Sequence, residues 1–136
     1  MLDVNEIVKK NGKTYKLVEI VNKVDERIEF FKKWSDTKYC LKAVKQNGYS
    51  LQYVKDQTEA ICLEAVKQNR YSLRYVKDQT EAICLEAVKG NGYYLQYVKD
   101  QTEAICLEAV KQDGMSLPYV KDVKIFEKII GGKIKC

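Results

Sequence analysis

The chain has 136 residues, of which 46% are hydrophobic and 32% charged, with a formal net charge of +5 and no histidine. This length suits one domain, and the composition lies near the globular average, which excludes wholesale disorder. The charge is modest and is spread along the chain, without the concentrated basic stripe that is typical of nucleic-acid-binding proteins.

The N-terminal sequence MLDVNEIVKKNG has no apolar core of the kind that a secretory signal needs, and no segment approaches the length of a membrane span. The five cysteines form an odd count, and their spacing follows a repeat instead of a disulfide framework. We therefore expect a cytoplasmic protein without a membrane partner.

Residues 1–24 form the first predicted segment. Asn11-Gly12 separates two stretches of partly alternating character, which is typical of the turn of a small β-hairpin. A pair of short helices is the alternative, because the apolar residues between Ile7 and Val21 also allow a helical stripe.

Residues 25–121 are predicted as an array of helical repeats. It starts with DERIEFFKKW, from Asp25 to Trp34, where acidic residues in the first turn favour the helix dipole. Within this stretch, Ile28–Lys32 aligns with Leu51–Lys55 of the first full repeat. We interpret it as a degenerate terminal copy, because a terminal repeat lacks one neighbour.

The full repeat contains fifteen residues, YVKDQTEAICLEAVK, that occur three times without a change, starting at Tyr53, Tyr75 and Tyr97. Their spacing of 22 residues indicates one supersecondary unit stacked on copies of itself. The regular apolar spacing and the single proline favour helices. We therefore predict an all-α fold, a short α-solenoid of antiparallel helix pairs.

Each copy is predicted to contain a longer and a shorter helix. The longer helix starts near Asp56 or Thr58 and ends near Gln68, with Asp56 and Glu59 as a capping box. On a helical wheel its apolar residues share one face, which consists of Ile61, Cys62, Leu63, Ala65 and Val66.

The turn that joins the two helices is predicted at Asn47-Gly48, with the glycine in the left-handed conformation of a C-terminal cap. Arg70 stands at the equivalent position of the next copy and would take that conformation at a cost of about 1 kcal/mol. Ser50 is expected to cap the shorter helix, from Leu51 to about Asp56, which is marginal unless its neighbours hold it.

Residues 122–136 are the predicted C-terminal cap of the array. Asp122 is expected to cap a changed helix, VKIFEKII, that ends at Gly131-Gly132. Pro118 is compatible with the first turn of the preceding short helix, where the N–H groups lack partners.

The sequence AVKQNG, from Ala43 to Gly48, followed by Leu51-x-Tyr53-Val54, resembles the repeats of an uncharacterised family found in tandem in giant viruses and some bacteria. The family consensus is close to LxAVKQNGxALxYxxxE, and the resemblance covers about Phe30 to Lys121. It implies an all-helical solenoid, and it implies no functional residues because the family has no assigned activity. The departures are Arg70, Gly90, Asp113 and the N-terminal segment up to Asp25.

A cysteine ladder is the first candidate for a metal or redox site. It consists of Cys40, Cys62, Cys84 and Cys106. Zinc needs four converging ligands, usually from CxxC or Cys/His pairs, and the sequence has neither. Neighbouring ladder cysteines are expected to lie one repeat apart, beyond the reach of a disulfide. We predict buried small hydrophobic residues, a free and exposed Cys136, and no metal or cofactor.

Acid–base catalysis finds no support in the carboxylates. Glu59 and Glu64 recur in every copy on the solvated face, and an active site is rarely built three times. The sequence contains no glycine-rich phosphate loop, nucleophile elbow or zinc-protease motif. We therefore predict no catalytic residues and no enzymatic activity.

The tyrosines form two columns. One, in the shorter helices, consists of Tyr53, Tyr75, Tyr97 and Tyr119, and the other, in the turns, consists of Tyr49, Tyr71 and Tyr93 with Met115 as its fourth member. The rings either shield the seams between repeats or form an aromatic ladder for a partner, because tyrosine and arginine dominate interface hot spots.

Differences between the copies concentrate at the turn and at the start of the shorter helix. They place two arginines beside the tyrosines on one edge, and we predict that this edge binds a protein. The candidate residues are Gln52, Arg70, Tyr71, Arg74, Tyr93, Tyr94 and Gln96. Neutral drift after a recent duplication explains the same pattern without a function.

The predicted function is a non-enzymatic protein–protein interaction module, because solenoids offer extended surfaces of repeated positions. Nucleic-acid binding through basic and tyrosine side chains is the alternative, and the interleaved acidic residues count against it. A narrower alternative is a virus- or phage-type inhibitor of a host defence complex, similar to an anti-CRISPR protein, which rests on the family resemblance and the small size alone. Near-identical copies allow a monomer or a domain-swapped dimer.

Overall fold

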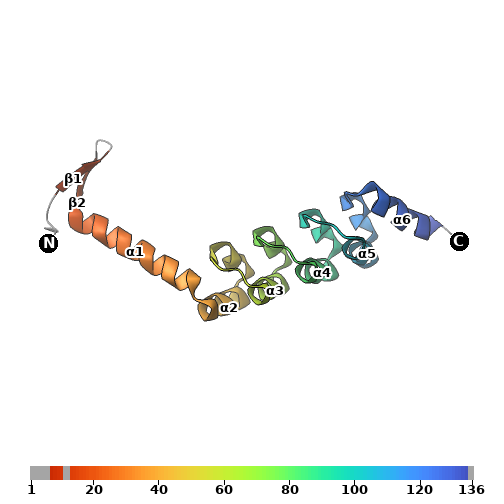
Figure 1. Cartoon of the computed structure of the whole chain (residues 1–136), viewed down its shortest axis with the longest axis horizontal. Helices are drawn as coiled ribbons and strands as arrows, with labels where there is room; N and C mark the ends of the chain where they lie inside the picture. The colour runs from red at the N-terminus through yellow and green to blue at the C-terminus, as the bar shows by residue number, and fades with distance from the viewer. Residues whose placement is uncertain (1–6, 11–12, 135–136) are drawn as a thin grey trace.

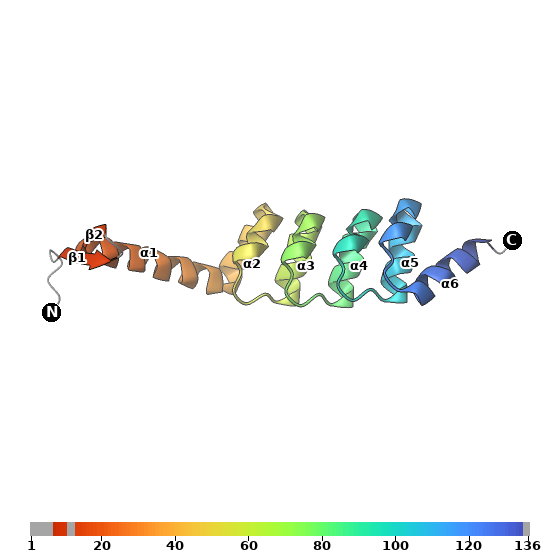
Figure 2. The same ribbon diagram turned by 90° about the horizontal axis from the view of Figure 1, so that it is seen from above.

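The computed structural model describes residues 7–10 and 13–134. Its elements follow one another along a rod: a small two-stranded sheet, a long helix, a row of stacked helix pairs, and a final helix (Figure 1). Each pair joins one α-helix to one 3₁₀-helix, and the α-helices α2 to α5 stand side by side across the rod (Figure 2). The repeat array is thus the all-α solenoid that the 22-residue period predicts.

The array is preceded by two strands and a long helix. Strand β1 (Ile7–Lys10) pairs antiparallel with β2 (Lys13–Lys16), with Val8 opposite Tyr15. The predicted turn at Asn11-Gly12 lies outside the described residues. Helix α1 (Leu17–Ser35) begins directly after β2, so it starts earlier than the predicted Asp25.

Helix α1 stays continuous because its apolar residues recur three and four positions apart, as a helix requires. These residues are Leu17, Val21, Val24, Ile28 and Phe31. The degenerate repeat copy proposed for Ile28–Lys32 therefore lies inside one long helix and forms no helix pair.

Four helix pairs form the array. They are α2 (Thr37–Gln46) with η1 (Gly48–Tyr53), α3 (Glu59–Gln68) with η2 (Arg70–Tyr75), α4 (Glu81–Gly90) with η3 (Gly92–Tyr97), and α5 (Glu103–Gln112) with η4 (Gly114–Tyr119). The longer helix of each copy is thereby confirmed. Its cap is Thr58, whose Oγ1 accepts the N–H of Ile61 at 3.2 Å. The capping box on Asp56 is wrong, because Asp56 lies two residues before the cap.

The shorter helix is a 3₁₀-helix and starts earlier than predicted. Asn47 ends α2 and at once caps η1, because its Oδ1 accepts the N–H of Tyr49 at 3.0 Å. Ser50 and Leu51 therefore lie inside η1, and the prediction that Ser50 is the cap is wrong. One asparagine serves both helices, so only one residue separates them, and the tight i→i+3 pattern fits into the short distance.

Glycine at the turn is required by space and not by backbone conformation. Asn47 is extended, with φ −150° and ψ 108°, and Gly48 is already helical. A Cβ on Gly48 would lie 2.5 Å from the carbonyl oxygen of Ala65 and 2.7 Å from Oγ of Ser72. The predicted left-handed conformation of Gly48 is wrong, and so is the backbone strain predicted for Arg70, which is a helical residue of η2.

One apolar column runs through the stack. The wheel prediction is confirmed, because Ile61, Cys62, Ala65 and Val66 are buried and Leu63 is half-buried. Leu51 of η1 and Val54, directly after η1, are 0% and 2% exposed. The second and third units bury the same positions, whereas Ala43 in the first unit and Leu117 and Val120 in the last are half-buried. A buried Val, Leu or Ile side chain contributes about 1.5–3 kcal/mol.

A glutamine ties each unit to the next. Nε2 of Gln57 donates to the carbonyl oxygens of Leu51 at 3.3 Å and Tyr75 at 2.9 Å, and its Oε1 accepts the N–H of Lys77 at 2.9 Å. The linkers lack regular structure, so these bonds satisfy backbone groups that would otherwise be unpaired. The same bonds recur at the equivalent residues Gln79 and Gln101.

Helix α6 (Val123–Ile134) ends the array and leans away from the row formed by α2 to α5 (Figure 2). The predicted cap is confirmed, because Oδ1 of Asp122 accepts the N–H of Lys124 at 2.8 Å. The predicted stop at Gly131-Gly132 is wrong, since α6 passes through both residues. Pro118 is the fifth residue of η4, so it does not lie in the first turn.

Candidate functional site

The tyrosines of η1 to η4 gather along one side of the array, which we call the tyrosine edge. It consists of Tyr49, Tyr53, Tyr71, Tyr75, Tyr93, Tyr94, Tyr97 and Tyr119. The 3₁₀-helices position these rings because each begins at the residue after an asparagine or aspartate cap, so equivalent tyrosines recur in the same place in each unit.

Rings of neighbouring units pack edge to face. Each turn-column tyrosine contacts the helix-column tyrosine of the following unit. The centroid distances are 6.2 Å for Tyr49 and Tyr75, 5.3 Å for Tyr71 and Tyr97, and 5.7 Å for Tyr93 and Tyr119. Such pairs contribute about 0.5–1.5 kcal/mol beyond their buried area, so the rings do shield the seams between units.

Part of each column also faces solvent. Tyr49, Tyr53 and Tyr93 are 37%, 44% and 42% exposed, and Met115, which ends the turn column, is 77% exposed. Tyr75 and Tyr119 are half-buried. The edge is therefore both a structural seam and an exposed aromatic strip.

Arg74 is held against two of these rings. Its guanidinium carbon lies 4.9 Å from the ring centroid of Tyr71 and 5.6 Å from that of Tyr97, and Nη1 donates to the hydroxyl of Tyr71 at 2.9 Å. The hydrogen bond from Tyr97 lowers the pKa of Tyr71, and the charge of Arg74 lowers it further. The same hydrogen bond to Tyr71, together with burial, raises the pKa of Tyr97. We call these three residues the Arg74 clamp.

Arg70 is half-buried and crosses to the next unit. A Cβ on Gly90 would collide with Nε of Arg70, so the arginine side chain fills the space that a side chain at position 90 would use. At the preceding junction the residue equivalent to Gly90 is Gln68, whose Oε1 accepts the N–H of Gly48 at 2.6 Å. Arg70 and Gly90 are thus a matched pair.

The structure brings most of the predicted site residues together. Tyr94 lies 6.4 Å from Tyr71 and 5.7 Å from Tyr93, measured between ring centroids. The group around η2 and η3 contains Arg70, Tyr71, Arg74, Tyr93 and Tyr94. Gln52 lies one unit away on η1, where its Nε2 donates to the carbonyl oxygen of Tyr49, and Gln96 makes the same local bond to Tyr93.

Two residues of this group were missing from the sequence prediction of the site. Tyr97 belongs to the Arg74 clamp, and Gly90 makes room for Arg70. The signal for Gly90 was present in the sequence, since Gly90 follows Arg70 by the same twenty residues that separate Gln68 from Gly48.

The ladder cysteines are buried, as predicted. Sγ of Cys62 lies 3.7 Å from Oε1 of Gln57, and Cys84 repeats this contact with Gln79 at 3.8 Å. Burial, helped by Asp78, raises the pKa of the Cys62 thiol to about 11. A protonated thiol is neither a metal ligand nor a nucleophile. Cys136 lies outside the described residues.

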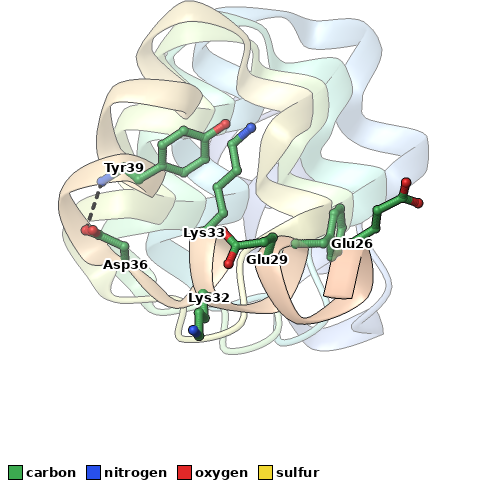
Figure 3. A pocket seen from close by; sticks show the side chains of 7 residues that line it. Glu26, Glu29, Lys32, Lys33, Asp36 and Tyr39 are labelled. Carbon is green, nitrogen blue, oxygen red and sulfur yellow. Dashed lines mark hydrogen bonds between the residues drawn. The ribbon is translucent and has the colours of Figure 1, made fainter. Parts of the chain in front are cut away.

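A hollow of about 680 Å³ lies between α1 and the start of α2 (Figure 3). Asp36 there caps α2 by accepting the N–H of Tyr39 at 3.2 Å, and Nζ of Lys33 stands 4.8 Å from the Tyr39 ring centroid. Glu26 and Glu29 point apart (Figure 3). These charged groups serve α2 or face solvent, and they do not converge on a common point.

Within residues 7–10 and 13–134, no group of three or more histidine, cysteine, aspartate or glutamate residues could hold a metal ion. Among the helices of that same part of the chain, none has the length and apolar character needed to cross a bilayer.

Comparison with known proteins gives one match. The family model described as "Domain of unknown function (DUF4116)" matches residues 36–79 and again residues 81–123. Each matched block contains two helix pairs, so the model treats two structural units as one domain. No curated protein and no solved structure matches the chain significantly.

Proposed function

Starting from the fact that the chain belongs to the family described as "Domain of unknown function (DUF4116)", we propose that its repeat array is a non-enzymatic module that binds another protein through the tyrosine edge. The observation that carries this proposal is the exposed aromatic strip formed by Tyr49, Tyr53, Tyr93 and Met115. Tyrosine is enriched among the residues that dominate binding energy at protein interfaces.

The packing of the rings supports the proposal. Each exposed ring rests on a neighbour, as Tyr93 rests on Tyr119, so its orientation is fixed before a partner arrives. A side chain that is already ordered loses little conformational entropy on binding. The strip therefore presents ordered tyrosine rings on the first and third units of a solenoid, and repeat proteins recognise partners through such extended surfaces.

Nucleic-acid binding is the competing function, and an observation of the edge counts against it. Bases stack on open faces of aromatic rings. The face of Tyr71 is already occupied by Arg74, and Tyr93 is packed on Tyr97 as well as on Tyr119. A virus- or phage-type role as an inhibitor of a host complex is a special case of protein binding, which the same experiment covers.

The test is an affinity capture from a lysate of the cells in which the protein occurs, with and without nuclease. We would compare wild type with Tyr93→Ser/Met115→Ser, which alters the strip. The control is Leu107→Ser on α5. Leu107 is apolar and 46% exposed, close to the 42% of Tyr93. Circular dichroism checks that all variants remain helical.

A nuclease-resistant protein partner that is lost with Tyr93→Ser/Met115→Ser and kept with Leu107→Ser would support the proposal. Equal capture by wild type and by the strip variant would refute the tyrosine edge as the binding surface. Recovery of nucleic acid alone would replace the proposal with the competing function.

A further inference from the structure

Departures from the repeat gather in two places. The last unit, which has no full unit after it, carries Asp113, Met115 and Pro118. Among the internal residues between Gln46 and Gln112, four differ from their equivalents in the other copies: Arg70, Arg74, Gly90 and Tyr94. All four lie at the junction of the second and third units, on η2, at the end of α4, and on η3.

Two of the four pack directly on each other, and a third stands where another junction has a contacting residue. Arg70 occupies the space above Gly90. At the junction one unit earlier, Ser72 contacts the place where Gly48 lacks a side chain, and Tyr94 is the equivalent of Ser72. Gly48, Gln68 and Ser72 of the first junction are thus replaced at the second junction by Arg70, Gly90 and Tyr94, respectively. We interpret the three replacements as one coordinated change.

Packing does not explain Arg74. Its equivalents are Gln52 and Gln96, which bond to the backbone within their own 3₁₀-helix. Arg74 is exposed and instead joins Tyr71 to Tyr97 across the junction. The junction also leaves Nε of Arg70 buried without a hydrogen-bond partner among the described residues.

No ion pair between described residues neutralises the charge of this junction. The ion pair that joins Lys128 to Glu103 lies far along the array. The Arg74 guanidinium donates one hydrogen bond to a neutral hydroxyl and keeps further N–H groups for a ligand. Stacking on two rings holds its plane in place, and a fixed guanidinium suits the paired oxygens of a carboxylate.

We propose that the junction of η2 and η3 recognises an acidic side chain on the partner, an aspartate or glutamate within an exposed segment, which pairs with Arg74 while neighbouring residues of that segment rest on Tyr93. This inference rests on the proposed function and names the partner's chemistry at the same edge. Arg74 has no arginine at its equivalent positions, which are Gln52, Gln96 and Pro118. The edge therefore offers one anion site instead of the basic track that a nucleic-acid backbone follows.

The repeat supplies the test variants. Arg74→Gln installs the residue that the array already carries at Gln52 and Gln96, so the fold tolerates it. Arg74→Gln/Gln52→Arg keeps the net charge of the wild type and moves the arginine to a junction with Gly48, Gln68 and Ser72. This second variant separates the effect of position from the effect of charge.

The experiment selects binders from a random peptide library displayed on phage, with wild type and with Arg74→Gln as bait. We expect wild type to enrich peptides with aspartate or glutamate and Arg74→Gln to lose that enrichment. For the best peptide, replacing its acidic residue by the amide should weaken binding to wild type about tenfold, and should have little effect on Arg74→Gln, because the two groups act as a pair. Arg74→Gln/Gln52→Arg should bind the peptide as weakly as Arg74→Gln does.

Three results would overturn the inference. Enrichment of peptides without acidic residues would refute the acidic partner and leave the tyrosine edge as a protein-binding surface. Full recovery of peptide binding by Arg74→Gln/Gln52→Arg would show that an arginine at the first junction recognises the acidic residue equally well. Tighter binding of oligothymidine than of the selected peptide at moderate salt would assign the site to nucleic acid. Failure of the proposed function itself is seen separately, in the capture experiment with Tyr93→Ser/Met115→Ser.

Discussion

Single side chains with long-range hydrogen bonds hold the units in register. Gln79 is half-buried, and its amide contacts backbone groups of two units: the carbonyl oxygens of Leu73 at 3.2 Å and Tyr97 at 3.0 Å, and the N–H of Lys99 at 2.9 Å. A buried backbone group that loses its partner costs about 1–3 kcal/mol. Each of these glutamines therefore contributes to stability on the scale of one or two buried aliphatic side chains.

Gln79→Leu should lower the free energy of unfolding by about 3 kcal/mol, because it leaves these backbone groups unpaired while it adds no cavity. The measurement is urea unfolding followed by circular dichroism. The control is Gln52→Leu, since Gln52 is exposed and makes one local bond. A loss from Gln79→Leu no larger than that from the control would contradict the role assigned to the glutamine.

The buried thiols make stability depend on pH in the alkaline range. Burial raises the pKa of Cys62 and of Cys84 to about 11, and nearby Asp78 and Asp100 add to the respective shifts. A thiol in the unfolded chain titrates near pH 8.5. The unfolded state therefore releases these protons first, so their contribution to stability is complete below about pH 8.5 and is lost as the pH rises towards 11.

We expect the unfolding temperature of the wild type to fall between pH 8.5 and 11, and to fall less steeply in Cys62→Ala/Cys84→Ala. The slopes are compared and not the absolute temperatures, because the smaller side chains also weaken the core. All other titratable groups are the same in both proteins, so their contributions cancel in the comparison. Parallel slopes would show that the thiols do not contribute.

At the scale of elements, η2 and α4 are fitted to each other. The side chain of Arg70 on η2 takes the space over Gly90 at the end of α4, whereas at the junction before it Gln68 bonds to Gly48. Two neighbouring units can thus be joined in two ways. At the first junction the glycine lies on the 3₁₀-helix (Gly48) and the larger side chain on the following α-helix (Gln68). At the second junction the larger side chain lies on the 3₁₀-helix (Arg70) and the glycine on the α-helix (Gly90).

Gly90→Gln should destabilise the protein by about 1–3 kcal/mol, because the new side chain collides with Arg70. Arg70→Gly/Gly90→Gln rebuilds the glycine–glutamine pair of Gly48 and Gln68, with Tyr94 in place of Ser72, and it should recover most of that loss. Urea unfolding of the two single variants and the double variant gives the coupling energy, which we expect to be about 1–3 kcal/mol in favour of the double variant. Additive effects would mean that the two residues do not interact.

At the scale of the molecule, the protein is a rod whose units contact mainly their sequence neighbours (Figures 1 and 2). Stability in such an array is close to a sum over units and junctions. Helix α1 continues the rod beyond the array, and its apolar residues Val21, Val24 and Ile28 are 37%, 51% and 44% exposed.

An additional unit should therefore stabilise the protein. The insert consists of residues 53–68 followed by residues 47–52, placed after Gln52, so that each new junction has the glycine, glutamine and serine of the first one. We expect a higher urea midpoint and a larger denaturant slope than in the wild type, because the insert adds a glutamine tie and a buried apolar layer. A lower midpoint would show that the number of units is fixed by the two ends.

Much of the fold followed from the sequence because its determinants are local and periodic. The repeat of 22 residues predicted the stack, the wheel predicted the buried face of α3, and Asp122 was predicted as the cap of α6. Each of these depends on residues within a few turns of one helix, where spacing alone determines which side chains share a face.

The tertiary structure decided what depends on distance between units. The 3₁₀ form of η1 to η4, the reach of Gln57 to Tyr75, and the fit of Arg70 to Gly90 join residues that are far apart in sequence and meet only when the units stack. The sequence thus determined an array of helices and the side on which its tyrosines stand. Stacking determined which of those tyrosines are exposed and that Arg74 is clamped between two of them, because both depend on the contact between neighbouring units.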